Sequence, residues 1–175
     1  DDIMAQIQRY NAAKAIAFGR DLPFIGINHL EGHIYANWLV EGPEPEFPAL
    51  CLVVSGGHTD LVFMRSHGEY QRLGGTRDDA AGEAFDKVGR LLGLPFPGGP
   101  HVAKHALEGG PSSVSLPRAW MHGTYDFSFS GLKTSVRYFL QKNPGLADSP
   151  AALRDVCASV RAAISEPKAT LQVLD

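Results

Sequence analysis

The sequence has 175 residues, of which 44% are hydrophobic and 20% are charged, and its formal net charge is −3. This length and composition suffice for one domain with a substantial core. The sequence contains no run of about 18 apolar residues, so we expect no membrane-spanning helix, and no basic-then-apolar leader opens it. Cys51 and Cys157 lack metal or redox spacing and lie in apolar segments, which predicts buried thiols and a cytoplasmic protein.

The charge is unevenly distributed along the chain. Residues 1–60 hold three Lys/Arg and eight Asp/Glu, whereas residues 87–142 hold seven Lys/Arg and two Asp/Glu. A basic segment of this kind could contact RNA phosphates, and it could equally be a solvated surface.

The first 40 residues contain two predicted helices and a short apolar run. Residues 4–20 have loose helical periodicity, and residues 24–27 predict a brief buried strand. If Asn28 caps a helix that reaches about Trp38, His29 and His33 project from the same face and could ligate one metal ion. The alternative is a helix N-terminus with two polar side chains. Glu31 lies about 200° round the helix from the first histidine, which weakens a zinc-peptidase interpretation.

Residues 50–54 and 61–64 are short apolar runs that predict two strands of a hairpin, and residues 69–73 predict a third strand. Ser55, Gly56, Gly57, His58 and Thr59 lie between the first two runs. Adjacent glycines suggest a turn with positive φ whose bare backbone could bind a phosphate. An ordinary hairpin turn is the alternative.

Residues 77–93 give the clearest helix, with Asp79 as N-cap and Gly93 as the residue after the C-cap. Asp79, Glu83 and Asp86 fall opposite the apolar stripe and repel one another. We find no structural need for these three acids, so ribose hydroxyls or a cation could be what they bind; the alternative is an exposed acidic face.

Several further elements are predicted after residue 93. Residues 94–100 predict a rigid turn with a second Gly-Gly pair, and a helix starts at residue 102. Residues 126–131 alternate like a strand, and two further helices are predicted over residues 132–140 and 150–164.

Five motifs occur in order, and together they closely resemble the TsaD family, the tRNA N6-adenosine threonylcarbamoyltransferases, also known as O-sialoglycoprotein endopeptidase or glycoprotease. The motifs are residues 28–33 (NHLEGH), 54–59 (VSGGHT), 78–87 (DDAAGEAFDK), 97–100 (PGGP) and 126–133 (DFSFSGLK). The resemblance implies an α/β fold of the actin-like, Hsp70-like ATPase class (ASKHA, ribonuclease H-like). It also implies transfer of a threonylcarbamoyl group from threonylcarbamoyl-AMP to the N6 amine of the adenosine just 3′ of the anticodon, in tRNAs that read ANN codons, with release of AMP.

The resemblance also implies roles for individual residues. His29 and His33 match metal ligands for one divalent ion, Fe²⁺ or Zn²⁺. Asp86 and Gly99 match residues that contact the nucleoside of an adenine nucleotide or threonylcarbamoyl-AMP. The matches to the substrate-binding loop are Val53, Val54, Ser55, Gly56 and Gly57. Implied partners are tRNA and, in bacteria, a smaller paralogue of the same fold (TsaB-like) and a P-loop ATPase (TsaE-like).

Two parts of the family pattern are not matched. The sequence contains neither the opening strand with its Gly-Ile-Glu-Thr-Ser-like motif nor the late aspartate that is the family's third metal ligand. We therefore expect residues 1–175 to be the central part of a two-lobed domain. Two alternatives to the transferase are a metallopeptidase and a catalytically silent nucleotide-binding module.

Overall fold

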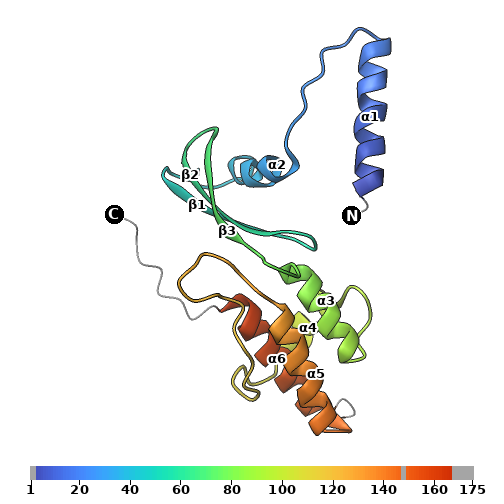
Figure 1. Ribbon diagram of the computed structural model, residues 1–175, viewed down its shortest axis with the longest axis vertical. Coiled ribbons are helices and arrows are strands. Elements are labelled where there is room, and N and C mark those ends of the chain that lie inside the picture. The colour runs from blue at the N-terminus through green and yellow to red at the C-terminus, as the bar shows by residue number, and fades with distance from the viewer. Residues whose placement is uncertain (1–2, 147–148, 167–175) are drawn as a thin grey trace. The chain divides into compact units, whose positions relative to one another are not determined.

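The computed structural model of the chain describes residues 3–146 and 149–166, and it divides into two units (Figure 1). Unit 1 comprises residues 1–45 and unit 2 comprises residues 46–175. The helices of unit 1 are α1 (Ile3–Gly19), α2 (His29–Tyr35) and the 3₁₀ helix η1 (Ala36–Trp38). The elements of unit 2 are β1 (Ala49–Val54), β2 (Thr59–Ser66), β3 (Glu69–Gly75), α3 (Ala81–Leu91), α4 (Gly98–Ala106), α5 (Ser130–Lys142) and α6 (Pro150–Ser165).

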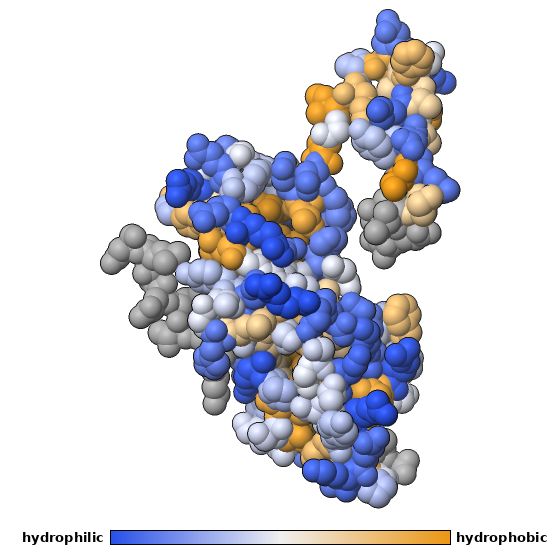
Figure 2. All heavy atoms as spheres, viewed as in Figure 1, coloured by the Kyte–Doolittle hydropathy of each residue, from blue (hydrophilic) through white to orange (hydrophobic). Residues whose placement is uncertain are grey.

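In unit 1, α1 confirms the predicted first helix, but apolar and polar side chains are interspersed over its surface (Figure 2). The predicted strand at residues 24–27 is wrong. These residues form no strand, and Ile25 and Ile27 are 84% and 76% exposed. A short apolar run becomes a strand only when a neighbour pairs with its backbone, and the described residues of unit 1 contain no such strand.

The second helix of unit 1 begins as its sequence predicts. Asn28 is the N-cap of α2 and has extended backbone angles. Its side-chain oxygen accepts hydrogen bonds from the backbone N–H groups of Leu30 at 2.9 Å and Glu31 at 3.3 Å. This satisfies two donors that a helix start would leave without partners. The helical path then continues through η1 to Trp38, which confirms the predicted extent.

The three strands of unit 2 form an antiparallel meander in the order β1-β2-β3, as predicted. Leu52 lies opposite Leu61, and Val54 lies opposite Thr59 at the end of the hairpin. A register shift between Leu61 and Val62 interrupts the pairing of β2 with β3. Leu61 and Met64 are the buried apolar side chains of β2, and Leu61 packs in an apolar cluster with Ala81 and Ala84 of α3.

The four helices of unit 2 pack around one apolar cluster. α3 contacts α4 and α5, and α4 contacts α6. The largest fully buried side chains of the cluster are Val88, Val102, Leu132, Val136, Val156, Val160 and Cys157. Burial raises the pKa of the Cys157 thiol to about 11, as expected for an inert thiol. Cys51 is only partly buried, with its sulfur 3.6 Å from that of Met64, so the prediction that both thiols are buried is half right.

Two boundaries that follow α3 in the chain differ from prediction. The expected strand at residues 126–131 is reduced to isolated bridges of Phe127 with Thr76 and Trp120, and α5 already begins at Ser130. The expected turn at residues 94–100 ends early, because α4 begins at Gly98. None of the helices in the described part of the chain combines the length and apolar character that crossing a membrane requires.

The early start of α4 brings two helices into backbone contact. A Cβ atom built on Gly89 in α3 would lie 2.8 Å from the Cα atom of Gly98, and one on Gly98 would lie 2.9 Å from the Cα atom of Asp86. Both distances are shorter than non-bonded carbon atoms allow. The glycines therefore set how closely α3 and α4 approach.

We predict that Gly89→Ala lowers the free energy of unfolding by about 1–3 kcal/mol, because the new methyl group forces the two helices apart. Gly131→Ala is the matched control, since Gly131 also lies in a helix but has no atom within 4 Å of a built Cβ. The control should be neutral or stabilising by about 0.5–1 kcal/mol. Urea unfolding followed by circular dichroism measures both, and equal effects would contradict the role of the contact.

Candidate functional site

The turn between β1 and β2 is closed by a serine side chain. The backbone N–H of Ser55 donates to the carbonyl of His58 at 2.9 Å, and the Ser55 hydroxyl accepts from the N–H groups of Gly57 at 3.2 Å and His58 at 3.0 Å. Gly56 and Gly57 do not have positive φ, so that part of the prediction is wrong. A Cβ built on either glycine would meet no atom within 4 Å, so the backbone of the turn stays accessible.

The other side of this turn is packed against the start of α3. The N–H of Gly82 donates to the carbonyl of Ser55 at 3.2 Å, and a Cβ on Gly82 would lie 2.9 Å from the Cα atom of Gly56. The hydroxyl of Thr59, which is 3% exposed, accepts from the N–H of Ala81 at 2.9 Å. Two of the motifs identified in the sequence, residues 54–59 and 78–87, are therefore in direct contact.

The predicted substrate-binding loop runs out of the end of β1 into this turn. Val53 is buried, whereas Val54 on the opposite face of the strand is 52% exposed. Ser55 and Gly56 then lie against α3, and Gly57 lies at the open side. A ligand at the turn would meet the main chain of the two glycines.

Two of the three predicted acids, Asp79 before α3 and Glu83 within it, pair with a lysine of the same helix. The ammonium group of Lys87 lies 2.6 Å from a carboxylate oxygen of Asp79 and 2.9 Å from one of Glu83. These hydrogen bonds raise the pKa of Lys87, and the one to Asp79 has the larger effect. The prediction that a helix surface has no need of these acids is therefore wrong. Asp79 is also not the N-cap, since Ala80 occupies that position.

Asp86 connects α3 to the first turn of α4. Its Oδ1 atom accepts hydrogen bonds from the backbone N–H groups of Gly98 at 2.7 Å and Gly99 at 3.3 Å. This arrangement brings together the two residues that the resemblance assigns to the nucleoside. A carboxylate can accept further hydrogen bonds at its second oxygen. The group is thus a fixed acceptor at a helix N-terminus, suited to binding hydroxyl groups.

His29 and His33 meet on one face of α2, as predicted. Their Nε2 atoms are 3.2 Å apart and their ring centroids are 4.5 Å apart. Two nitrogen ligands about 2.0–2.1 Å from one tetrahedral ion would lie about 3.3–3.4 Å from each other. The pair therefore fits as two ligands of one ion, although residues 3–146 and 149–166 contain no group of three or more His, Cys, Asp or Glu that could complete a metal site.

Sequence analysis missed Asp78, which joins two of the motifs. Its Oδ1 atom accepts from the N–H groups of Phe129 at 2.7 Å and Ser130 at 3.3 Å, and its other oxygen pairs with the hydroxyl of Ser128. Burial raises the pKa of Asp78, but the hydrogen bonds from residues 128–130 outweigh burial, so the pKa is lowered. One signal could have pointed to this contact. The N-cap of α5, Phe129, has no polar side chain, so the first backbone N–H groups of the helix need an acceptor from another segment.

Comparison with known proteins identifies one family. The family model TsaD, tRNA N6-adenosine threonylcarbamoyltransferase, matches residues 10–173. A protein of that name from Symbiobacterium thermophilum is 60% identical over 155 residues, which are 89% of this chain and 45% of the relative. A protein of the same name from Thermomicrobium roseum is 61% identical over 137 residues, which are 75% of this chain and 38% of the relative. One from Dehalococcoides mccartyi is 54% identical over 164 residues, 94% of this chain and 46% of the relative. The chain thus spans less than half the length of these curated relatives.

We predict that Asp78→Asn lowers the free energy of unfolding by about 1–2 kcal/mol at pH 7, because the amide accepts weaker hydrogen bonds from the start of α5. The folded-state pKa of Asp78 is lowered from 3.8, so its contribution is fully present above about pH 4. It is lost as the pH falls through the folded-state pKa. The difference between variant and parent should therefore shrink below pH 4.

Urea unfolding at a series of pH values between 7 and 2.5 measures this difference. The matched control is Glu44→Gln, since Glu44 is an exposed carboxylate in a loop. It should leave stability within about 0.5 kcal/mol of the parent. A penalty for Asp78→Asn that stays constant down to pH 2.5 would refute the contribution of the ionised carboxylate.

Proposed function

Because this chain belongs to the TsaD family, the tRNA N6-adenosine threonylcarbamoyltransferases, we propose that it carries part of that transferase. In the proposed reaction a threonylcarbamoyl group moves from threonylcarbamoyl-AMP to the N6 amine of the adenosine just 3′ of the anticodon, in tRNAs that read ANN codons, and AMP leaves. The observation that carries the proposal is the arrangement around α3, where the turn at Ser55 and the Asp86–Gly99 pair are each fixed to the same helix.

The fold agrees with the family. TsaD proteins have the ASKHA-type α/β fold, and the mixed α/β structure of unit 2, with its three-stranded sheet, is consistent with part of such a domain. In folds of this kind the ligand sites lie in loops held by a rigid scaffold. The hairpin turn and the α3–α4 connection are such loops here.

The residues of unit 2 would bind and orient the acyl-adenylate. The carboxylate of Asp86, held by the N–H groups of Gly98 and Gly99, would accept hydrogen bonds from ribose hydroxyls. The accessible main chain of Gly56 and Gly57 would let the phosphate approach closely. Because the acyl group of a mixed anhydride is already activated, positioning the attacking amine supplies much of the catalysis.

His29 and His33 would hold a divalent ion, Fe²⁺ or Zn²⁺, as part of the same proposal. The separation of 3.2 Å between their Nε2 atoms supports this. An ion bound there supplies Lewis-acid chemistry and a template for oxygen ligands. The two imidazoles contribute neutral nitrogen donors from adjacent turns of one capped helix.

The proposal includes cytoplasmic action on tRNA, together with the two protein partners that the family resemblance implies, a smaller paralogue of the same fold and a P-loop ATPase. The basic composition of residues 87–142, which include α4 and α5, supports contact with an RNA backbone. Contacts of this type weaken as salt concentration rises, so binding of tRNA should show a strong salt dependence.

We predict that Asp86→Asn weakens binding of AMP by about tenfold, because a neutral amide replaces the charged acceptor for ribose hydroxyls. Isothermal titration calorimetry with the present chain measures the affinity. Arg90→Gln is the matched control, since Arg90 is exposed on the same helix, and it should bind AMP as the parent does. In a version extended to the full length of the curated relatives, Asp86→Asn should also slow transfer from threonylcarbamoyl-AMP to tRNA.

The outcomes separate the proposed functions. Transfer to tRNA by the extended protein supports the transferase. Binding of AMP without any transfer would favour a silent nucleotide-binding module. If AMP bound neither parent nor control, the assignment of Asp86 and Gly99 to a nucleoside would be wrong.

For the metal, we predict that His33→Ala lowers the affinity for Zn²⁺ by at least about tenfold, because one of two nitrogen ligands is lost. Equilibrium dialysis with metal analysis measures this on the protein alone, without reference to activity. His122→Ala, which removes an exposed histidine from a loop of unit 2, should have no effect. Equal zinc binding by parent and His33→Ala would remove the histidine pair from the proposal.

A further inference from the structure

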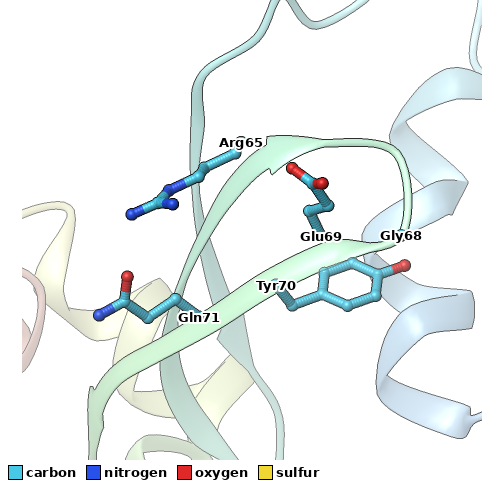
Figure 3. Close-up of a pocket in the computed structure, with 5 residues that line it drawn as sticks. All are labelled: Arg65, Gly68, Glu69, Tyr70 and Gln71. Carbon is cyan, nitrogen blue, oxygen red and sulfur yellow. The ribbon is translucent and has the colours of Figure 1, made fainter.

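Two hollows on unit 2 lie outside the residues that surround α3. One, of about 450 Å³, lies at the β2–β3 hairpin and is lined by Arg65, Gly68, Glu69, Tyr70 and Gln71. Arg65 and Gln71 extend to one side of the hairpin and Tyr70 extends to the other (Figure 3). This hollow carries an acidic side chain as well as a basic one, so its lining has no net preference for an ion of either sign.

The other hollow, of about 320 Å³, is lined by the segment before α5 and by α6, and its lining contains no carboxylate. The lining residues are Pro111, Ser112, Val114, Ser115, Leu116, Arg118 and Ser159. Its volume is at the lower end of the range for small-molecule sites, about 300–1,000 Å³. Three hydroxyl groups and one guanidinium therefore share a hollow large enough for a small anion.

Arg118 is a half-buried residue, and one nitrogen of its guanidinium has no partner in the described part of the chain. Its Nη1 atom is buried and has no hydrogen-bond partner among the residues that the structure describes. No ion pair within residues 3–146 and 149–166 uses Arg118 either. Burying a charged nitrogen without a partner is costly, and the penalty is relieved when an anion binds.

The walls of this hollow are held in place by α6. The hydroxyl of Ser159, itself 2% exposed, accepts from the N–H of Val114 at 3.0 Å and donates to the carbonyl of Gly110 at 3.3 Å. Asp155 accepts from the N–H of Gly110 at 2.7 Å, and the N–H of Ala119 donates to the carbonyl of Ala163. The loop that carries Arg118 is thus tied to α6 before and after the arginine.

We infer that the hollow lined by Arg118, Ser112 and Ser115 binds a phosphate group. A guanidinium matches a phosphate with two parallel hydrogen bonds, and serine hydroxyls can donate to its remaining oxygens. A phosphate group offers three acceptor oxygens to these donors, whereas a carboxylate offers two. The phosphate could belong to a small free anion or to the backbone of an RNA, and the inference does not depend on the proposed function.

The test is a titration of the ¹⁵N-labelled chain with inorganic phosphate at low salt, followed by NMR of the arginine Nε–H groups and the backbone amides. We expect saturable shifts at Arg118 and at residues 112–115. R118Q should weaken binding by at least about tenfold, since it removes a charge-assisted hydrogen bond. R137Q, the control, removes an exposed arginine from α5 and should bind phosphate unchanged.

Two further measurements identify the source of the phosphate and keep the test valid if R118Q unfolds. S115A removes an exposed hydroxyl and should weaken binding about threefold without loss of structure; this variant decides the matter if R118Q does not fold. Tighter binding of a short oligoribonucleotide than of inorganic phosphate assigns the site to RNA, and the reverse assigns it to a small anion. Absence of saturable shifts at Arg118, equal binding by acetate, or indifference to both substitutions would overturn the inference.

Discussion

Close approach of main chains along α3 is the constraint on which the described part of unit 2 depends. At its first turn, Gly82 lets the helix lie against the hairpin turn, and at its last turn Gly89 lets it lie against the start of α4. A side chain at either position would need space that backbone atoms occupy. Because both loops are fixed to one rigid helix, their separation is set by the length of that helix. The candidate ligand-binding loops are therefore placed by packing, before any ligand is present.

A second feature recurs in unit 2: an aspartate side chain accepts hydrogen bonds from backbone N–H groups of another segment. Asp86 binds the start of α4, Asp78 binds the start of α5, Asp126 accepts from the N–H of Gly75, and Asp155 accepts from the N–H of Gly110. Charged acceptors at helix starts and loops compensate N–H groups that have no partner in regular structure. Carboxylates that look like an acidic surface in the sequence are here cross-links between segments. For Asp126 the hydrogen bond from Gly75 and the contact with Arg77 lower the pKa, and for Asp78 the hydrogen bonds from residues 128–130 outweigh burial and lower it too. These two carboxylates therefore act in their ionised form.

Features that depend on interactions between residues close in the sequence could be predicted, and most features that depend on distant residues could not. The three strands and α3, with Gly93 at φ +73 after its end, were predictable because alternation, helical spacing and a terminal glycine are local signals. Most failures concern distant partners. Residues 24–27 are apolar but have no strand to pair with among the described residues of unit 1. The pairing of Lys87 with Glu83 is the exception, because it is an i,i+4 contact within α3 and therefore a local signal. The contact of Asp78 with Phe129 joins residues 51 positions apart, and no local sequence pattern indicates a contact over that separation.

The way in which these groups are held also limits the chemistry of the site. Ser55 lies near His58 in the sequence, but its hydroxyl oxygen already accepts hydrogen bonds from two backbone N–H groups of its own turn. Nucleophilic serines need a free lone pair and an adjacent base aimed at the hydroxyl proton. Asp86 is likewise occupied at one oxygen by two N–H donors. Residues arranged in this way are suited to binding and orienting a ligand. This agrees with the proposed reaction, in which an acyl-adenylate would bring its own leaving group and no covalent enzyme intermediate would be required.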